Sequence, residues 1–228
     1  MNVLTSVDIA RTIDHSLLRP ELTPKEVSEG LQLALDYNVA AATVRPCDVV
    51  AAQRALAGSD VLVNTVIGFP HGSSTTEVKI FEAEKAMDEG ATELDVVLNI
   101  GWLKGGEDAL VELELGRVLE TAHAEAALVK VILETGYLTD ELIVRACQIC
   151  DRAGADFVKT STGYGPSGAT IEHVRLMRAS VGQGVKVKAA GGIRTLDQVL
   201  KLLDAGASRI ATRATREILE EARARQGG

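Results

Sequence analysis

The sequence is short of cysteine, histidine and aromatic residues. Its 228 residues include three cysteines and four histidines, and aromatic side chains make up 3% of the chain. So few cysteines cannot supply the disulfide framework of a small secreted domain, and an odd number fits a reducing compartment. The segment 1–11 lacks the apolar run of a secretory signal, and no stretch approaches the roughly 20 apolar residues of a membrane span. We therefore expect a cytoplasmic protein with no membrane partner.

Positive charge is also scarce. Lysine and arginine total 24 against 32 acidic residues, which gives a net charge of −8. Nucleic-acid-binding proteins carry clustered basic residues, so we expect no nucleic-acid partner. The histidines lie far apart in the sequence, and Cys147 and Cys150 lie in an expected helix without a second pair. Because a metal site needs several ligands together, we expect no metal, and nothing in the motifs below requires an organic cofactor.

One pattern recurs along the chain: an amphipathic helical stretch ends at Gly-Ala, and a short apolar strand follows at once. It occurs at Gly90-Ala91, Gly154-Ala155 and Gly206-Ala207. Glycine is common just past a helix C-terminus because it adopts positive φ without steric cost. Helix starts are marked as well, most clearly by the capping box over residues 23–26, which has proline at the first helical position. Helices and strands are therefore expected to alternate.

This alternation predicts eight strand–helix units. We expect helices over residues 24–37, 47–57, 74–89, 107–124, 139–153, 170–181, 195–204 and 215–225, and strands near 10–14, 39–45, 61–67, 93–99, 128–134, 155–160, 185–190 and 207–211. Eight such units in one α/β domain over residues 1–228 fit a (β/α)8 TIM barrel with a parallel sheet. The alternative is an open doubly wound sheet. Its first strand is normally followed by a glycine-rich phosphate loop, and residues 15–20 contain no glycine.

Four charged residues lie on strands that a barrel normally fills with apolar side chains. They are Asp95, Lys130, Lys159 and Lys188, on the expected strands four to seven. Burial of an unpaired charge costs several kcal/mol, so charges at such positions need partners. Parallel strands of a barrel place their carboxyl ends together, where the active sites of this fold lie. The four side chains are therefore expected to converge.

Such a cluster suits Schiff-base chemistry. A neutral lysine amine attacks a carbonyl to form an imine, which withdraws electrons during carbon–carbon bond cleavage. Lys159 ends its strand and is the candidate nucleophile. Lys188 is the candidate neighbour that lowers the pKa of Lys159, and Asp95 can carry protons. The alternative is a set of structural ion pairs, and strand placement alone does not separate the two interpretations.

Glycine-rich segments follow both of these lysines. Residues 160–168 directly follow Lys159, and residues 190–194 follow Lys188. Glycines allow a close approach to the backbone, and successive N–H groups can bind a phosphate. Ordinary β–α turns also use glycine, so the hypothesis of a phosphate site depends on the lysines beside these segments.

At these residues the sequence resembles the deoxyribose-phosphate aldolase family, over nearly its whole length. The resemblance lies in residues 13–20 (IDHSLLRP), 66–72 (VIGFPHG), 93–101 (ELDVVLNIG), 130–135 (KVILET), 155–163 (ADFVKTSTG) and 187–194 (VKAAGGIR). It implies that Lys159 is the Schiff-base lysine, that Lys188 lowers its pKa and that Asp95 relays protons. It also implies substrate contacts from Asp14, Lys130, Thr160, Gly163, Gly191 and Gly192.

The resemblance further implies reversible cleavage of the phosphosugar 2-deoxy-D-ribose 5-phosphate to acetaldehyde and D-glyceraldehyde 3-phosphate, by a homo-oligomer (dimer or larger). Two features depart from the family pattern. Thr43 lies near a position that usually holds cysteine. The last strand of the family usually leads into a glycine and a serine pair, where this chain has Ala211, Arg213 and Ala214. Arg213 is a candidate phosphate donor in their place.

The altered last loop leaves a second interpretation open, a related class I aldolase or transaldolase with another acceptor. A third interpretation, from a different class of protein, is a non-catalytic barrel that binds phosphosugars. The combination of Lys159, Lys188 and Asp95 argues against this third interpretation, because a binding module has no use for two buried amines.

Overall fold

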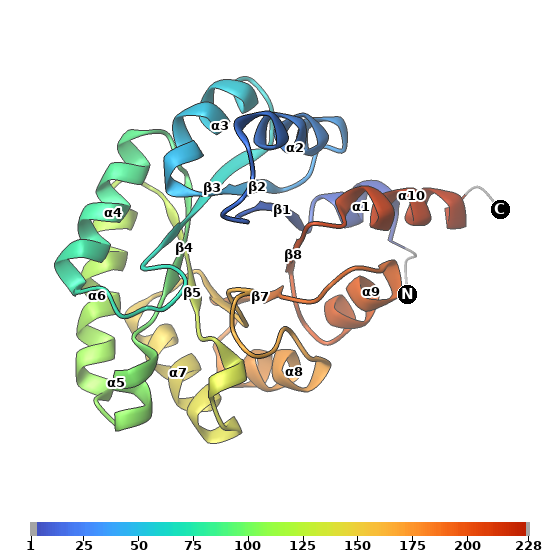
Figure 1. The fold of residues 1–228 in the computed structure, drawn as a ribbon. Coiled ribbons are helices and arrows are strands. Elements are labelled where there is room, and N and C mark those ends of the chain that lie inside the picture. The colour runs from blue at the N-terminus through green and yellow to red at the C-terminus, as the bar shows by residue number, and fades with distance from the viewer. Residues whose placement is uncertain (1–3, 227–228) are drawn as a thin grey trace.

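The computed structural model describes residues 4–226, and its centre is a closed barrel of eight parallel strands (Figure 1). The strands are β1 (Ile13–Leu17), β2 (Ala41–Val44), β3 (Leu62–Ile67), β4 (Glu93–Val97), β5 (Leu128–Ile132), β6 (Phe157–Lys159), β7 (Lys186–Ala190) and β8 (Arg209–Thr212). Neighbours in the chain pair with each other, and β8 closes on β1. This confirms the predicted (β/α)8 barrel. That one domain spans residues 1–228 stays a prediction, and residues 1–3 and 227–228 lie outside the described part.

Helices surround the barrel (Figure 1). They are α1 (Ser6–Ala10), α2 (Pro24–Asp36), α3 (Val49–Leu56), α4 (Thr76–Asp88), α5 (Ile100–Gly105), α6 (Asp108–Ala124), α7 (Asp140–Ala153), α8 (Ile171–Ser180), α9 (Leu196–Asp204) and α10 (Thr215–Gln226), with 3-10 turns η1 (Pro46–Asp48) and η2 (Thr135–Tyr137). All eight expected helices agree with the structure within two residues at each end. Within residues 4–226, every helix is too short or too polar to cross a membrane.

The expected start and stop signals lie at helix ends. The Thr23 side chain accepts a hydrogen bond from the backbone of Glu26, whose carboxylate accepts one from the Thr23 N–H at 2.8 Å. Gly90, Gly154 and Gly206 have φ values of 106°, 85° and 107°. Side chains are strained in this left-handed region, so glycine at these positions lets each helix stop and the next strand begin within a few residues.

The first strand was predicted too early. Residues 10–14 were expected to be extended, but β1 begins at Ile13, and α1 occupies the segment before it. A complete capping box between Thr5 and Asp8 forms this helix, and the short apolar run within it fits either structure. Helix α5 was also missed. It is six residues long and begins after Asn99, whose side chain caps it.

The two faces of the barrel strands differ in chemistry. Leu94 and Val129 belong to the apolar core that the strands form with the surrounding helices. The alternating positions point into the barrel, and there Asp95, Lys130 and Lys188 are fully buried. The apolar burial that stabilises the fold therefore lies between barrel and helices, which leaves the interior of the barrel free to hold charged groups.

Candidate active site

Strand β6 places Lys159 at the carboxyl end of the barrel. Lys159 is the last residue of the strand and pairs with Ile132 on β5 and with Lys188 on β7. Its side chain is only 2% exposed, yet it forms part of the wall of a cavity. An amine in this position is desolvated but still accessible to a small molecule.

Asp95 lies at the centre of a buried network with three lysines. Its Oδ2 accepts hydrogen bonds from Lys159 Nζ at 2.6 Å and from Lys188 Nζ at 2.7 Å. Its Oδ1 accepts one from Lys130 Nζ at 3.2 Å. The four charged side chains therefore meet, as their positions on neighbouring strands predicted.

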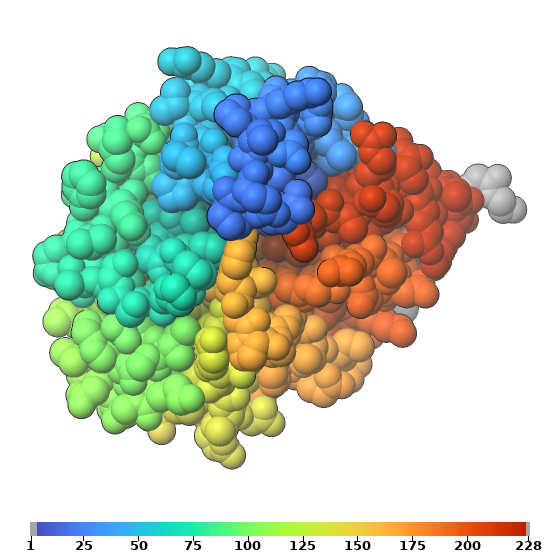
Figure 2. Space-filling model, in the orientation of Figure 1, coloured from blue at the N-terminus to red at the C-terminus, as the bar shows by residue number. Residues whose placement is uncertain are grey.

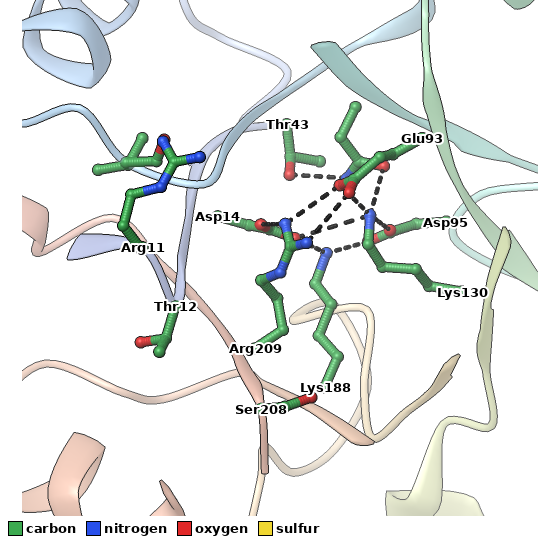
Figure 3. Close-up of polar contacts among 12 residues, drawn as sticks. Arg11, Thr12, Asp14, Thr43, Glu93, Asp95, Lys130, Lys188, Ser208 and Arg209 are labelled. Atoms are coloured by element: carbon green, nitrogen blue, oxygen red, sulfur yellow. Dashed lines mark hydrogen bonds and ion pairs between the residues drawn. The ribbon is translucent and has the colours of Figure 1, made fainter. Parts of the chain in front are cut away.

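Three more charged residues complete this network (Figure 3). Glu93 lies 2.6 Å from Lys130 Nζ and 3.1 Å from Arg209 Nη2. Asp14 lies 2.6 Å from Lys188 Nζ and 2.7 Å from Arg209 Nη1. Asp14 and Lys130, which the resemblance assigned to the substrate, are thus surrounded by charged partners inside the barrel.

The network contains one more basic group than acidic groups. Its members are Lys130, Lys159, Lys188 and Arg209 on one side and Asp14, Glu93 and Asp95 on the other. With every group ionised, the barrel interior would hold one uncompensated positive charge, which is unfavourable by several kcal/mol. The loss of one proton removes that excess, and Lys159 is the amine that forms part of the cavity wall.

The surroundings of Lys159 increase the fraction of its amine that is neutral. Burial lowers the pKa of Lys159 from 10.5 to about 8, and the nearby Lys188 ammonium acts in the same direction, while Asp95 opposes both. At pH 7 a pKa of about 8 leaves roughly a tenth of the amine neutral, against roughly one part in 3,000 for an ordinary lysine. Burial disfavours the charged form of Asp95, but the ammonium groups of Lys159 and Lys188 outweigh burial and hold the pKa of Asp95 well below its usual range.

The cavity beside Lys159 has a volume of about 670 Å³. Gly163, Gly191, Gly192 and Arg213 also contribute to its wall, so five of the predicted site residues surround one space. The three glycines have φ values of 87°, 91° and 79°, which side chains rarely adopt. Their backbone groups therefore reach the cavity without a covering side chain.

Thr160, which the resemblance assigned to the substrate, directs its hydroxyl toward the neighbouring strand β7. Its hydroxyl donates a hydrogen bond to the carbonyl of Ala190 and accepts one from the N–H of Ala190, both at 3.0 Å. It is fully buried and is not among the residues of the cavity wall. The side chain thus extends the pairing of β6 and β7, and its contact with a substrate stays a prediction.

The segment that departs from the family pattern also borders the cavity. Ala211, Arg213 and Ala214 all contribute to its wall, and the Arg213 side chain is exposed. Thr43, near the position where cysteine is usual, contributes as well, and its hydroxyl accepts a hydrogen bond from Asn64 Nδ2 at 2.8 Å.

Sequence reasoning missed Glu93 and Arg209. A signal for Glu93 was available, because it lies two residues before Asp95 and therefore points to the same face of β4. Arg209 begins the last strand and reaches Glu93 from the far side of the barrel. Only the closure of the barrel brings these two residues together, and no local pattern indicates it.

Comparisons with known proteins identify the family of the chain. Residues 13–215 match the model of the DeoC/LacD family aldolases. The chain belongs to this family. It is 49% identical over 222 residues to the deoxyribose-phosphate aldolase of Thermococcus gammatolerans, an alignment that covers 96% of this chain and 99% of the relative. The enzyme of that name from Caldanaerobacter subterraneus subsp. tengcongensis is 48% identical, with 94% of each chain covered. The chain is therefore an aldolase, a carbon–carbon lyase that acts on small molecules.

Solved structures give the same result for the fold. The putative deoxyribose-phosphate aldolase of Coccidioides immitis superposes with a TM-score of 0.92 at 40% identity, over 96% of this chain and 87% of that one. The tetrameric deoxyribose phosphate aldolase of Aeropyrum pernix superposes with a TM-score of 0.91 at 33% identity, over 97% and 93% of the two chains.

Proposed function

We propose that this aldolase reversibly cleaves 2-deoxy-D-ribose 5-phosphate to acetaldehyde and D-glyceraldehyde 3-phosphate through an imine on Lys159. The observation that carries the proposal is a buried lysine, with a pKa lowered to about 8, at the wall of a cavity large enough for a phosphosugar. The names of the relatives support the substrate.

In the proposed reaction, the neutral Nζ of Lys159 attacks C1 of the open-chain sugar, and the carbinolamine loses water to give the imine. The imine accepts the electron pair of the C2–C3 bond as the C3 hydroxyl loses its proton, which releases glyceraldehyde 3-phosphate. The remaining enamine takes up a proton at C2 and is hydrolysed to acetaldehyde. Asp95 is proposed to relay protons because its Oδ2 contacts both Lys159 and Lys188.

We assign Asp14 and Lys130 a supporting role in this scheme. Asp14 contacts Lys188 at 2.6 Å, and Lys130 contacts Asp95 at 3.2 Å. Neither contributes to the wall of the cavity. Their contacts with charged partners support a role in positioning Lys188 and Asp95 rather than in touching the sugar.

The phosphate of the substrate is proposed to bind at Gly163, Gly191 and Gly192, with Arg213 as a charge-assisted donor. Arg213→Ala is expected to raise KM for 2-deoxyribose 5-phosphate by roughly 10- to 100-fold, in line with one charge-assisted hydrogen bond. KM for unphosphorylated 2-deoxyribose should not change. An equal change for both sugars would place Arg213 outside the phosphate site.

Trapping of the imine tests the central claim. The protein is incubated with acetaldehyde and sodium borohydride, and the modified peptide is identified by mass spectrometry. Reduction should fix a two-carbon adduct on Lys159, and the Lys159→Arg variant should carry none. An adduct on another lysine, or no adduct, would contradict the proposed nucleophile.

A related class I aldolase or transaldolase with another acceptor is the second candidate. The observation that favours it is the segment with Ala211 and Ala214, where the family usually has glycine and serine. Equal kcat/KM values for 2-deoxyribose 5-phosphate and 2-deoxyribose would support this second candidate. Acetaldehyde should still be trapped on Lys159 in that case.

We also propose a cytoplasmic homo-oligomer of two or more copies. Three cysteines, all free in the structure, support a reducing compartment. A tetramer is known for the Aeropyrum pernix relative. Phe81 on α4 and Leu113 on α6 are 66% and 62% exposed, and these two helices pack side by side. Light scattering should give a mass above that of one chain, and Phe81→Glu should lower it.

A further inference from the structure

A second cavity lies beside the one that contains Lys159. It has a volume of about 320 Å³, and its own wall residues are Pro70, His71, Ile100, Lys104, Tyr137 and Gly165. Thr162 and Tyr164 line both cavities. These two residues are therefore the partition between a space with the reactive lysine and a space without it.

The partition belongs to the β6–α8 loop (residues 160–170), which crosses the mouth of the barrel. In Figure 2 the orange chain of this region runs across the face toward the blue segment that follows β1. The hydroxyl of Tyr164 donates a hydrogen bond to the carbonyl of Leu18 at 2.8 Å. Its ring meets the Phe69 ring edge-on, with the centroids 5.5 Å apart. Tyr164 thus connects the loop to the segments after β1 and β3.

Thr162, the other residue of the partition, is held by Glu134. The Thr162 N–H donates a hydrogen bond to Glu134 Oε2 at 3.1 Å, and the Thr162 hydroxyl donates to the same oxygen. This hydroxyl also accepts the N–H of Tyr164 at 3.0 Å. Glu134 is only 1% exposed and has a φ of 55°, an uncommon conformation for a residue other than glycine. Both ends of the partition are therefore fixed by specific contacts.

We propose that Tyr164 is a specificity-determining residue, whose ring closes the second cavity to aldehydes that react at Lys159. The proposal rests on the proposed function, since it requires the imine at Lys159. Pro70, Ile100 and the ring of Tyr137 form the apolar part of the wall of the second cavity, beside the polar side chains of His71 and Lys104. The molecules that it would admit, once opened, are aldehydes with an unbranched apolar chain, and the ring of Tyr164 excludes them in favour of short polar ones.

The test is an aldol addition of acetaldehyde to hexanal. The enamine carbon of the donor forms a bond to the carbonyl carbon of hexanal, whose oxygen takes up a proton, and hydrolysis releases the 3-hydroxyaldehyde. Tyr164→Ala should raise the absolute kcat/KM for hexanal by about fourfold for each methylene that enters the second cavity. Tyr164→Phe keeps the ring and should remain near the wild-type value. Tyr164→Leu gives a second open variant if alanine disturbs the loop.

A variant in which the second cavity is filled again distinguishes the opening of this cavity from a general loosening of the loop. Ile100→Phe added to Tyr164→Ala should cancel the gain for hexanal. Three results would each overturn the proposal. The first is no increase in kcat/KM for hexanal in either open variant. The others are an increase that persists after Ile100→Phe and an equal increase in Tyr164→Phe. Borohydride trapping of acetaldehyde is measured on the same proteins. A wild-type protein without an adduct on Lys159 would contradict the proposed function itself, whatever the response to hexanal.

Discussion

The molecule buries lysines in two regions, and the two regions treat them differently. Lys79 lies in the helical layer, where its Nζ contacts Glu114 Oε1 at 2.6 Å and the carbonyl of Val97 at 2.8 Å. Both ionic side chains of this pair are fully buried. Lys159 is buried to a similar degree inside the barrel, where it shares Asp95 with other lysines.

The difference between the regions is the balance of charge. Burial lowers the pKa of Lys79, and Glu114, its ion-pair partner, opposes that change together with the nearby Glu82. In the barrel, four basic groups face three carboxylates, and burial together with Lys188 lowers the pKa of Lys159 to about 8. Lys159 also reaches a cavity. Burial alone therefore does not distinguish a nucleophile; an excess of positive charge and an open path to the amine do.

Removal of the shared carboxylate is expected to have the largest effect. Asp95→Asn leaves four basic groups with two carboxylates, and loss of one partner from a buried ion pair typically costs 3–5 kcal/mol, so we expect unfolding to become easier by about that amount. Loss of the proton relay should lower kcat by roughly 100- to 10,000-fold. Denaturant unfolding and steady-state kinetics measure the two effects.

A matched control is Asp197→Asn. Asp197 pairs with Arg225 at 2.8 Å on the surface, where both side chains are about half exposed. Loss of such a pair should change stability by at most about 1 kcal/mol. If the two variants lost equal stability, the barrel network would be no more sensitive to charge than the surface.

The second prediction alters the charge balance in the other direction. Lys188→Met leaves three basic groups and three carboxylates and removes an ammonium that lowers the pKa of Lys159. The pKa of Lys159 should therefore rise above about 8, so that the neutral amine is reached only at higher pH. Trapping rates measured from pH 6 to 10 should rise through about pH 8 in the wild type and at higher pH in the variant.

At pH 7 the trapping rate of Lys188→Met should fall about tenfold for each unit by which this pKa rises. The rate at high pH should recover toward that of the wild type. An unshifted profile with a uniformly lower rate would mean that Lys188 acts by proton transfer and not through the pKa of its neighbour.

Local patterns made most of the fold predictable. Glycine with positive φ at 90, 154 and 206 marks helix ends, and these turns depend on a few neighbouring residues. The first strand was predicted too early because the apolar run before Ile13 suits either structure, and the hydrogen bonds of the Thr5 cap favour the helix. Short segments with weak periodicity are therefore where sequence reasoning fails.

The site was predictable where its residues share neighbouring strands. Asp95 and Lys188 could be placed together because charges on buried strands need partners. Arg209 could not, since its contact with Glu93 spans 116 residues and requires a closed barrel. The bond from Tyr164 to Leu18 could not be predicted either, since it spans 146 residues between two irregular segments. Contacts between loops leave no periodic pattern in the sequence, and the partition formed by Thr162 and Tyr164 is held by such contacts.

The smallest effect on catalysis is expected from the balanced pair in the helical layer. Lys79→Met alone leaves Glu114 buried without its partner and should cost about 3–5 kcal/mol of stability. Lys79→Met combined with Glu114→Leu removes both charges, and such replacements are often close to neutral. Because neither residue contributes to the cavity that contains Lys159, the double variant should keep kcat within about twofold of wild type and trap acetaldehyde on Lys159. Lys79 donates a hydrogen bond to the carbonyl of Val97, at the end of the strand that carries Asp95. A stable double variant with a much lower kcat would show that this bond positions the catalytic network. The two regions of buried lysine would then be coupled.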